Sequence, residues 1–190
     1  MMTYPNAAAG LKTVYQARLV GLISIVLVIV PIVQVLAVAA MLIAGFLALV
    51  GLAQCRKDDN GYCTAFNMVI AGLVTNLAAS LVSAYAGAEG FAGICGNILS
   101  IATDVLSLAS LYFVCITTNR LLKETAAAEN LIDRGIVVWR LNVVCTVILL
   151  VCYLLRMIPG NIAAIIAGYL AIFALIAQIV GNVLYILYLH

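Results

Sequence analysis

The sequence predicts an all-α, polytopic membrane protein that folds as a compact bundle of six transmembrane helices. Three observations lead to this prediction. Hydrophobic residues make up 67% of the 190 residues and charged residues only 8%, whereas an ordinary soluble domain has about 25% charged residues. Polar or turn-forming segments divide the chain into stretches that are long enough to cross a bilayer. The basic residues gather on one side of the membrane that these stretches define.

The first apolar stretch, residues 15–54, is about twice as long as the roughly 20 residues that a helix needs for one crossing. Pro31 lies near its middle, where proline removes a backbone donor and disfavours helix at the preceding residue. We therefore predict two helices, over 15–32 and 34–54, that meet in a tight hairpin. The alternative is a single long, tilted and kinked helix, which would give five crossings in total.

The remaining apolar stretches each have the length of one crossing. They predict helices over residues 62–86, 94–118, 136–157 and 162–188. The glycine-rich segment 87–96 predicts an exposed flexible loop, with a lid over a cavity as the alternative. In the segment 119–134, Arg120 and Glu124 have i,i+4 spacing and good helix formers follow, so the fourth helix should continue beyond the bilayer.

Charge placement distinguishes six crossings from five, because lysine and arginine concentrate in the short cytoplasmic loops of membrane proteins. With six crossings and the N-terminus inside, eight of the nine basic residues fall on the inner side. This inner set comprises Lys12, Arg18, Arg56, Lys57, Arg120, Lys123, Arg134 and Arg140. Five crossings would split the basic residues between both faces. We therefore expect a multi-pass protein of the cell (cytoplasmic) membrane, of bacterial type, with both termini in the cytoplasm.

The main functional signal is Asp104, an acidic residue predicted near the bilayer midplane. A carboxylate at that depth is costly and must face the bundle interior or a wet cavity. Asn97, Ser100 and Ser107 recur with it at three- and four-residue intervals, so the four side chains share one helix face. This face predicts a site for a cation, a proton or the amine of a small solute. The structural alternative is a hydrogen-bonded Asp104 that only ties helices together.

Two other predicted helices carry polar side chains at a matching depth. The third contains Asn76 and Ser80, and the sixth contains Gln178 and Asn182 about one turn apart. We expect these residues to complete the site, which would then lie between the third, fourth and sixth helices. The resulting hypothesis is a transporter for a small solute, coupled to protons or cations, or a substrate-binding membrane subunit.

Small residues in the second predicted helix support a different function. Ala40, Ala44 and Ala48 are four residues apart, and Gly45 and Gly51 lie nearby. Such spacing allows another helix to approach closely. The alternative is therefore a non-transporting membrane protein, such as an assembly, immunity or accessory subunit, that binds partner helices through small-residue faces.

Composition also excludes several classes of function. The only histidine is His190 and no second carboxylate is predicted beside Asp104, so acid–base and nucleophilic schemes lack a partner and we expect no enzyme, cofactor or metal site. A formal net charge of +2 provides no basic stripe for nucleic acid. The expected partners are the lipid bilayer, a small molecule or ion, and either a membrane partner subunit or a second copy of the chain.

In outline, the chain is similar to the substrate-binding membrane subunits of energy-coupling-factor vitamin transporters. The similarity lies in six short-looped helices, both termini inside and a length of 190 residues. Ala17 and Gly21 also give a small-residue spacing at the inner end of the first helix, similar to the alanine spacing by which that family docks its coupling subunit. The resemblance implies a substrate-binding role with a membrane partner and assigns no binding residues.

Overall fold

The structure, a computed structural model, describes residues 4–28, 34–86, 90–124, 129–157 and 161–189. Every regular element within these ranges is an α-helix. The helices are α1 (Pro5–Val28), α2 (Gln34–Cys55), α3 (Asn60–Ala86), α4 (Gly90–Glu124), α5 (Glu129–Met157) and α6 (Asn161–Leu189). The predicted all-α class is confirmed, and the first long apolar stretch forms two helices.

Five of the helices contain segments that are long and apolar enough to cross a membrane. Among the described residues these segments are Val35–Cys55, Asn60–Val82, Gly93–Glu124, Leu131–Leu155 and Gly168–Leu189. The chain therefore has the helices of a multi-pass membrane protein. The exception is α1, in which Lys12, Arg18 and several uncharged polar residues interrupt the apolar run.

Some boundaries differ from the sequence prediction. The first helix begins at Pro5 rather than near residue 15, because proline suits the first turn of a helix, where its missing N–H needs no partner. The predicted flexible loop in the glycine-rich segment is wrong from Gly90 onward, where α4 begins. Helical hydrogen bonding outweighs the weak helix propensity of glycine there, since unpaired backbone groups are costly near a membrane. The continuation of α4 beyond residue 118, to Glu124, is confirmed.

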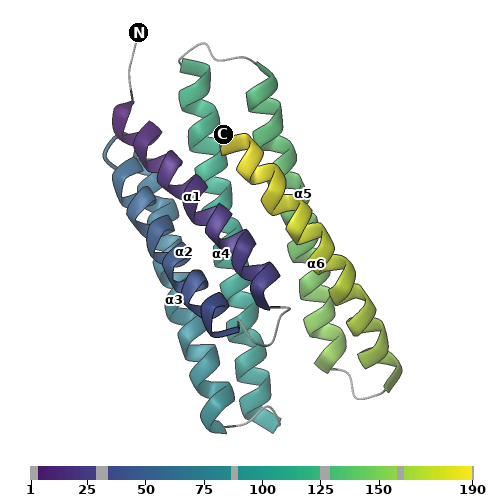
Figure 1. Cartoon of the computed structure of the whole chain (residues 1–190). Helices are drawn as coiled ribbons and strands as arrows, with labels where there is room; N and C mark the ends of the chain where they lie inside the picture. Colours follow the sequence, from purple (N-terminus) through teal and green to yellow (C-terminus); the bar gives the residue numbers. More distant parts are fainter. Residues whose placement is uncertain (1–3, 29–33, 87–89, 125–128, 158–160, 190) are drawn as a thin grey trace.

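The six helices form three antiparallel hairpins, α1–α2, α3–α4 and α5–α6 (Figure 1). Each helix packs against the next one in the chain, and α6 packs against α1, which closes the hairpins into a ring. Within the described ranges, the backbone of α3 contacts α2 and α4 but not α6. The single long, kinked helix of the alternative is wrong, since the first apolar stretch folds back on itself as the antiparallel pair α1–α2.

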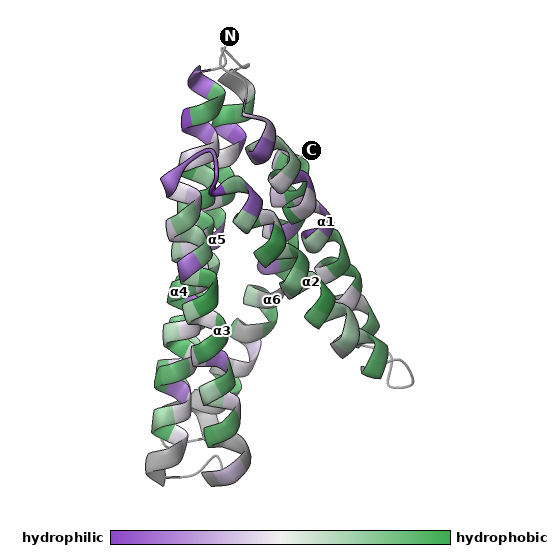
Figure 2. Cartoon of the chain, turned by 90° about the vertical axis from the view of Figure 1, so that its left-hand side faces the viewer, coloured by the Kyte–Doolittle hydropathy of each residue, from purple (hydrophilic) through white to green (hydrophobic). Residues whose placement is uncertain are grey.

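The apolar core lies at the end of the bundle that holds the start of α1 and the end of α6, which we call the terminal end. Its largest buried side chains include Tyr62, Val138 and Tyr185. Toward the opposite end, the α1–α2 and α3–α4 hairpins diverge (Figure 2). Apolar side chains there are highly exposed, for example Val35 at 82% and Phe46 at 68%. Side chains of this kind would contact lipid in a membrane.

Polar contacts surround the core at the terminal end. Asp58, in the α2–α3 connection, accepts hydrogen bonds from the Asn6 side chain and from the backbone N–H of Ala7, both at 2.7 Å. This carboxylate satisfies one of the free N–H groups in the first turn of α1. Asp59 accepts a hydrogen bond from the Gly61 N–H at 2.7 Å, which caps α3, and it also pairs with Arg120 of α4. These contacts join α1, α3 and α4 at this end.

Candidate functional site

The structure places Arg18 at the middle of the α1–α2 hairpin. Gly10 of α1 faces Gly51 of α2, and Gly21 faces Ala44. Arg18 lies between these two contacts, opposite the middle of the apolar segment of α2. The sequence pattern places Arg18 among the basic residues of the inner side, whereas in the structure it lies well inside the hairpin. Its helix starts well before the predicted boundary, so Arg18 lies several turns from the terminal end.

Asp104 lies at a similar depth in the α3–α4 hairpin. Its neighbour Thr103 forms a hydroxyl–hydroxyl hydrogen bond of 3.0 Å with Thr75, and Gly72 faces Leu106. These contacts are close to the middle of the apolar segment of α3. Asp104 therefore lies near the middle of the paired apolar segments of α3 and α4.

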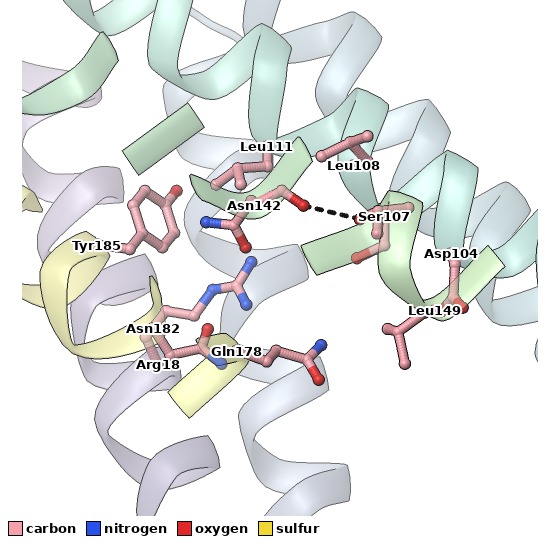
Figure 3. A pocket seen from close by; sticks show the side chains of 11 residues that line it. Arg18, Asp104, Ser107, Leu108, Leu111, Asn142, Leu149, Gln178, Asn182 and Tyr185 are labelled. Atoms are coloured by element: carbon pink, nitrogen blue, oxygen red, sulfur yellow. Dashed lines mark hydrogen bonds between the residues drawn. The ribbon is translucent and has the colours of Figure 1, made fainter. Parts of the chain in front are cut away.

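A cavity of about 80 Å³ lies between Arg18 and Asp104 (Figure 3). A space of this size accommodates several water molecules. Most of the side chains that line it are polar, and they come from four helices and all three hairpins. They are Arg18 of α1; Asp104, Ser107, Leu108 and Leu111 of α4; Asn142, Thr146 and Leu149 of α5; and Gln178, Asn182 and Tyr185 of α6.

The apolar core borders this cavity on the side of the terminal end. Leu111 and Tyr185 line the cavity and also belong to the core, where they are 7% and 2% exposed. The core continues from them to Cys55 and Tyr188, near the ends of α2 and α6. The cavity is therefore separated from the terminal end by closely packed apolar and tyrosine side chains.

Asp104 is only partly satisfied by protein groups. Tyr153 of α5 donates a hydrogen bond to its carboxylate. The other oxygen, Oδ2, is buried and has no hydrogen-bond partner among the described residues. A buried carboxylate oxygen without a partner loses hydration and gains nothing in exchange, so this position favours a proton, a cation or a ligand donor.

Arg18 reaches the cavity from the opposite hairpin (Figure 3). Its guanidinium carbon lies 5.1 Å from the ring centroid of Tyr185, which is a cation–π distance. Within the described ranges Arg18 forms no ion pair with a carboxylate. The guanidinium thus rests on an aromatic ring and keeps N–H donors available toward the cavity.

The polar side chains of α5 are partly used within their own helix. The Asn142 side chain donates to the carbonyl of Val138 at 2.9 Å. The Thr146 hydroxyl donates to the carbonyl of Asn142 at 2.9 Å, the bond drawn in Figure 3. The side-chain oxygen of Asn142 and the lone pairs of Thr146 remain as acceptors for a ligand or water.

The sequence-predicted site residues separate into two groups. Those that line the cavity are Asp104, Ser107, Gln178 and Asn182. Those that do not line it are Asn97 and Ser100 of α4 and Asn76 and Ser80 of α3. The hydroxyls of Ser80 and Ser100 bond within their own helices, each at 3.0 Å, and Asn76 is exposed.

The cavity does not lie between the third, fourth and sixth helices, where the sequence predicts the site. The cavity lies between α1, α4, α5 and α6. The physical reason is the ring order: α3 contacts α4 through Thr75 and Thr103, and its backbone does not reach α6 within the described residues. Polar side chains further along α3 consequently face away from the cavity.

Sequence reasoning missed Arg18, Asn142, Thr146 and Tyr153. Asn142 and Thr146 have i,i+4 spacing inside the fifth predicted helix, and this signal alone would have indicated a polar face. Arg18 could not be found in this way, because a basic residue early in a first membrane helix usually lies at the membrane interface.

Comparison with known proteins assigns no family to the chain. It matches no protein-family model, no curated protein and no solved structure.

Proposed function

We propose that this protein binds a small polar solute in the cavity around Asp104 and carries it across a cell membrane. The observation that carries the proposal is the position and lining of the cavity. It lies at mid-depth of apolar helices, it is lined mainly by polar side chains, and all three hairpins contribute to it. Polar and ionisable groups at this depth are expensive, and they mark ligand and ion pathways in membrane proteins.

The orientation of the chain is part of the proposal. The basic residues near the terminal end are Lys12, Arg56, Lys57, Arg120, Lys123, Arg134 and Arg140. By the positive-inside rule, this end faces the cytoplasm, with both termini there. The apolar core closes the cavity on that side, whereas the hairpins diverge on the other side (Figure 2). This shape supports a state whose cavity is accessible from outside the cell.

Transport would follow from a change in hairpin packing. Closing the hairpins at the diverging end and separating them at the terminal end would expose the same cavity to the other side. Solute binding and protonation of Asp104 would shift the equilibrium between these two arrangements. Each hairpin packs more closely within itself than against the next hairpin, and this arrangement fits rigid-body movement around the cavity.

The small-residue face of α2 supports this function over partner binding. Gly51 and Ala44 contact Gly10 and Gly21 of the chain's own α1. Two members of the face that we expect to recruit a partner helix, Ala44 and Gly51, therefore pack within the chain itself.

The test is retention and uptake of a solute. Purified protein is analysed by native mass spectrometry for bound small molecules, and proteoliposomes are assayed for uptake from a mixture of small polar solutes. We expect the wild type to retain a solute and Asp104→Asn to lose it. Asp133→Asn, which removes an exposed carboxylate outside the cavity, should retain it. An empty wild type, or equal retention by Asp104→Asn, would contradict the proposal.

A further inference from the structure

The cavity contains one basic and one acidic side chain that do not pair with each other. Arg18 enters from the α1–α2 hairpin and Asp104 from the α3–α4 hairpin, and Figure 3 places them on opposite sides of the cavity. Arg18 rests on the ring of Tyr185, and Oδ2 of Asp104 has no partner among the described residues. The cavity is therefore bordered by two oppositely charged side chains, and neither is in contact with a group of opposite charge among the described residues.

A counter-charge matters at this depth because an unpaired charge is strongly disfavoured away from bulk water. A cationic ligand would neutralise Asp104 and leave Arg18 unpaired, and an anionic ligand would do the reverse. A ligand with one ammonium and one carboxylate group neutralises both side chains at once and adds no net charge to the membrane interior. This inference rests on the proposed function, because it specifies the solute that the same cavity would take.

We propose that the cavity binds a small zwitterion, with its carboxylate at Arg18 and its ammonium at Asp104. The planar guanidinium offers paired N–H donors that match the two oxygens of a carboxylate. Gln178 and Asn182 lie beside Arg18 in Figure 3 and supply amide donors to the same group. On the other side, the Asp104 carboxylate and the Ser107 hydroxyl accept hydrogen bonds from the ammonium.

The size and lining of the cavity restrict the ligand further. The volume is about 80 Å³, and the only apolar side chains among the lining residues are Leu108, Leu111 and Leu149. A bulky apolar side chain on the ligand would find few apolar side chains to pack against. The ligand class is therefore an amino acid with a small side chain, or a short chain with amino and carboxyl groups at its two ends.

The experiment measures binding of defined probes to the purified full-length protein in lipid nanodiscs by calorimetry. The zwitterionic probes are glycine, L-alanine, L-serine, β-alanine and γ-aminobutyrate. The singly charged analogues are propionate and propylamine. We expect at least one zwitterion to bind, and both analogues to bind about ten- to a hundredfold more weakly, since each leaves one charged group of the site unpaired.

Variants test which side chain binds the carboxylate of the ligand and which binds its ammonium group. Arg18→Gln should lower the affinity for the zwitterion and for propionate but not for propylamine, and Asp104→Asn should lower it for the zwitterion and propylamine but not for propionate. Lys12→Gln and Asp133→Asn remove matching charges outside the cavity and should bind like the wild type. The double variant Arg18→Gln/Asp104→Asn has a neutral cavity, so it should remain folded and bind none of the probes.

The outcomes separate this inference from the proposed function. If propionate or propylamine binds as tightly as the zwitterions, the cavity does not select for a zwitterion and this inference fails. The proposed function, binding of a small polar solute, is then unaffected. If none of the probes binds but the protein retains another solute through Asp104, the inferred ligand class is wrong. The proposed binding site is then still supported. If the protein neither retains a solute nor binds a probe, both proposals fail.

Discussion

Gly10 of α1 and Gly51 of α2 meet backbone to backbone, and a Cβ on Gly51 would lie only 2.7 Å from the carbonyl oxygen of Gly10. A Cβ on Gly10 would likewise collide with the Gly51 carbonyl and with Cys55. Lipid chains are as apolar as leucine, so helices associate in membranes largely through such close backbone approach. This crossing holds α1, the helix that falls short of a membrane span, against α2, and it thereby fixes the position of Arg18.

Gly10→Ala should destabilise the protein by about 1–3 kcal/mol, because the added methyl forces the two helices apart. Gly45→Ala on α2 is the matched control, since a Cβ there meets no atom within 4 Å. The control should be neutral or gain up to about 1 kcal/mol from better helix propensity. Thermal unfolding in detergent measures both variants. Equal unfolding temperatures for Gly10→Ala and Gly45→Ala would show that the crossing is looser than described.

Asp58 should make the terminal end sensitive to acid. The hydrogen bond from the Asn6 side chain and that from the Ala7 N–H lower the pKa of Asp58 below its ordinary value of 3.8. Because the pKa is lower in the folded state, the carboxylate contributes stability above the ordinary pKa, and this contribution is lost as the pH falls through the folded pKa.

The measurement is thermal unfolding of the wild type and Asp58→Asn across acidic pH. The wild type should be the more stable protein near neutral pH, and the difference should shrink below about pH 4. Asp133→Asn, at an exposed position of the same end, serves as the control. A difference between wild type and Asp58→Asn that stays constant with pH would show that the ionised carboxylate is not the stabilising form.

Thr75 and Thr103 should couple α3 to α4. Their hydroxyls are 3.0 Å apart, and each also bonds to a carbonyl of its own helix. Substitution of both by valine, singly and together, gives a double-mutant cycle with an expected coupling of roughly 0.5–1.5 kcal/mol. Ser80→Ala, which removes a hydroxyl that bonds only within α3, should change stability little. Strictly additive effects of the two valine substitutions would contradict an interhelical bond.

Cysteine labelling should distinguish the face of α4 that lines the cavity from the face that packs against α3. Ser107 lines the cavity and is exposed, whereas Ser110 is 6% exposed and donates a hydrogen bond to the Ala65 carbonyl of α3 at 3.2 Å. Ser107→Cys should react with a membrane-impermeant thiol reagent applied outside intact cells, and Ser110→Cys should not. The background replaces Cys63 and Cys95, which are partly exposed. Labelling of Ser107→Cys only after the cells are opened would reverse the proposed orientation.

Much of the fold could be predicted because it depends on local signals. The proline break at Pro31 correctly indicated two helices instead of one, and the charged connection before Asn60 correctly indicated the start of another hairpin. The boundaries were less predictable, as Gly90 shows, because glycine marks a loop by propensity and yet lies in a helix here. A helix that is stabilised by its neighbours can include residues that local propensity would exclude.

The candidate site was predictable only one helix at a time. Asp104 and Ser107 share a face by their spacing, as do Gln178 and Asn182, and all four side chains line the cavity. Asn76 was assigned to the same site with equal logic, yet it lies outside the cavity. Helical periodicity tells which side chains share a face, but not which other helix that face meets.

By itself, the sequence determined the all-α class, the helix pairs and the place of Asp104 within an apolar segment, since these follow from apolar length and breaks along one chain. Only the tertiary structure decided that α6 packs against α1 and thereby brings Arg18 into the cavity of Asp104. The physical reason is that lipid and protein interior are similarly apolar. The order of helices in a membrane bundle therefore depends on close packing, such as that of Gly10 against Gly51, and leaves little trace in the hydropathy of each helix.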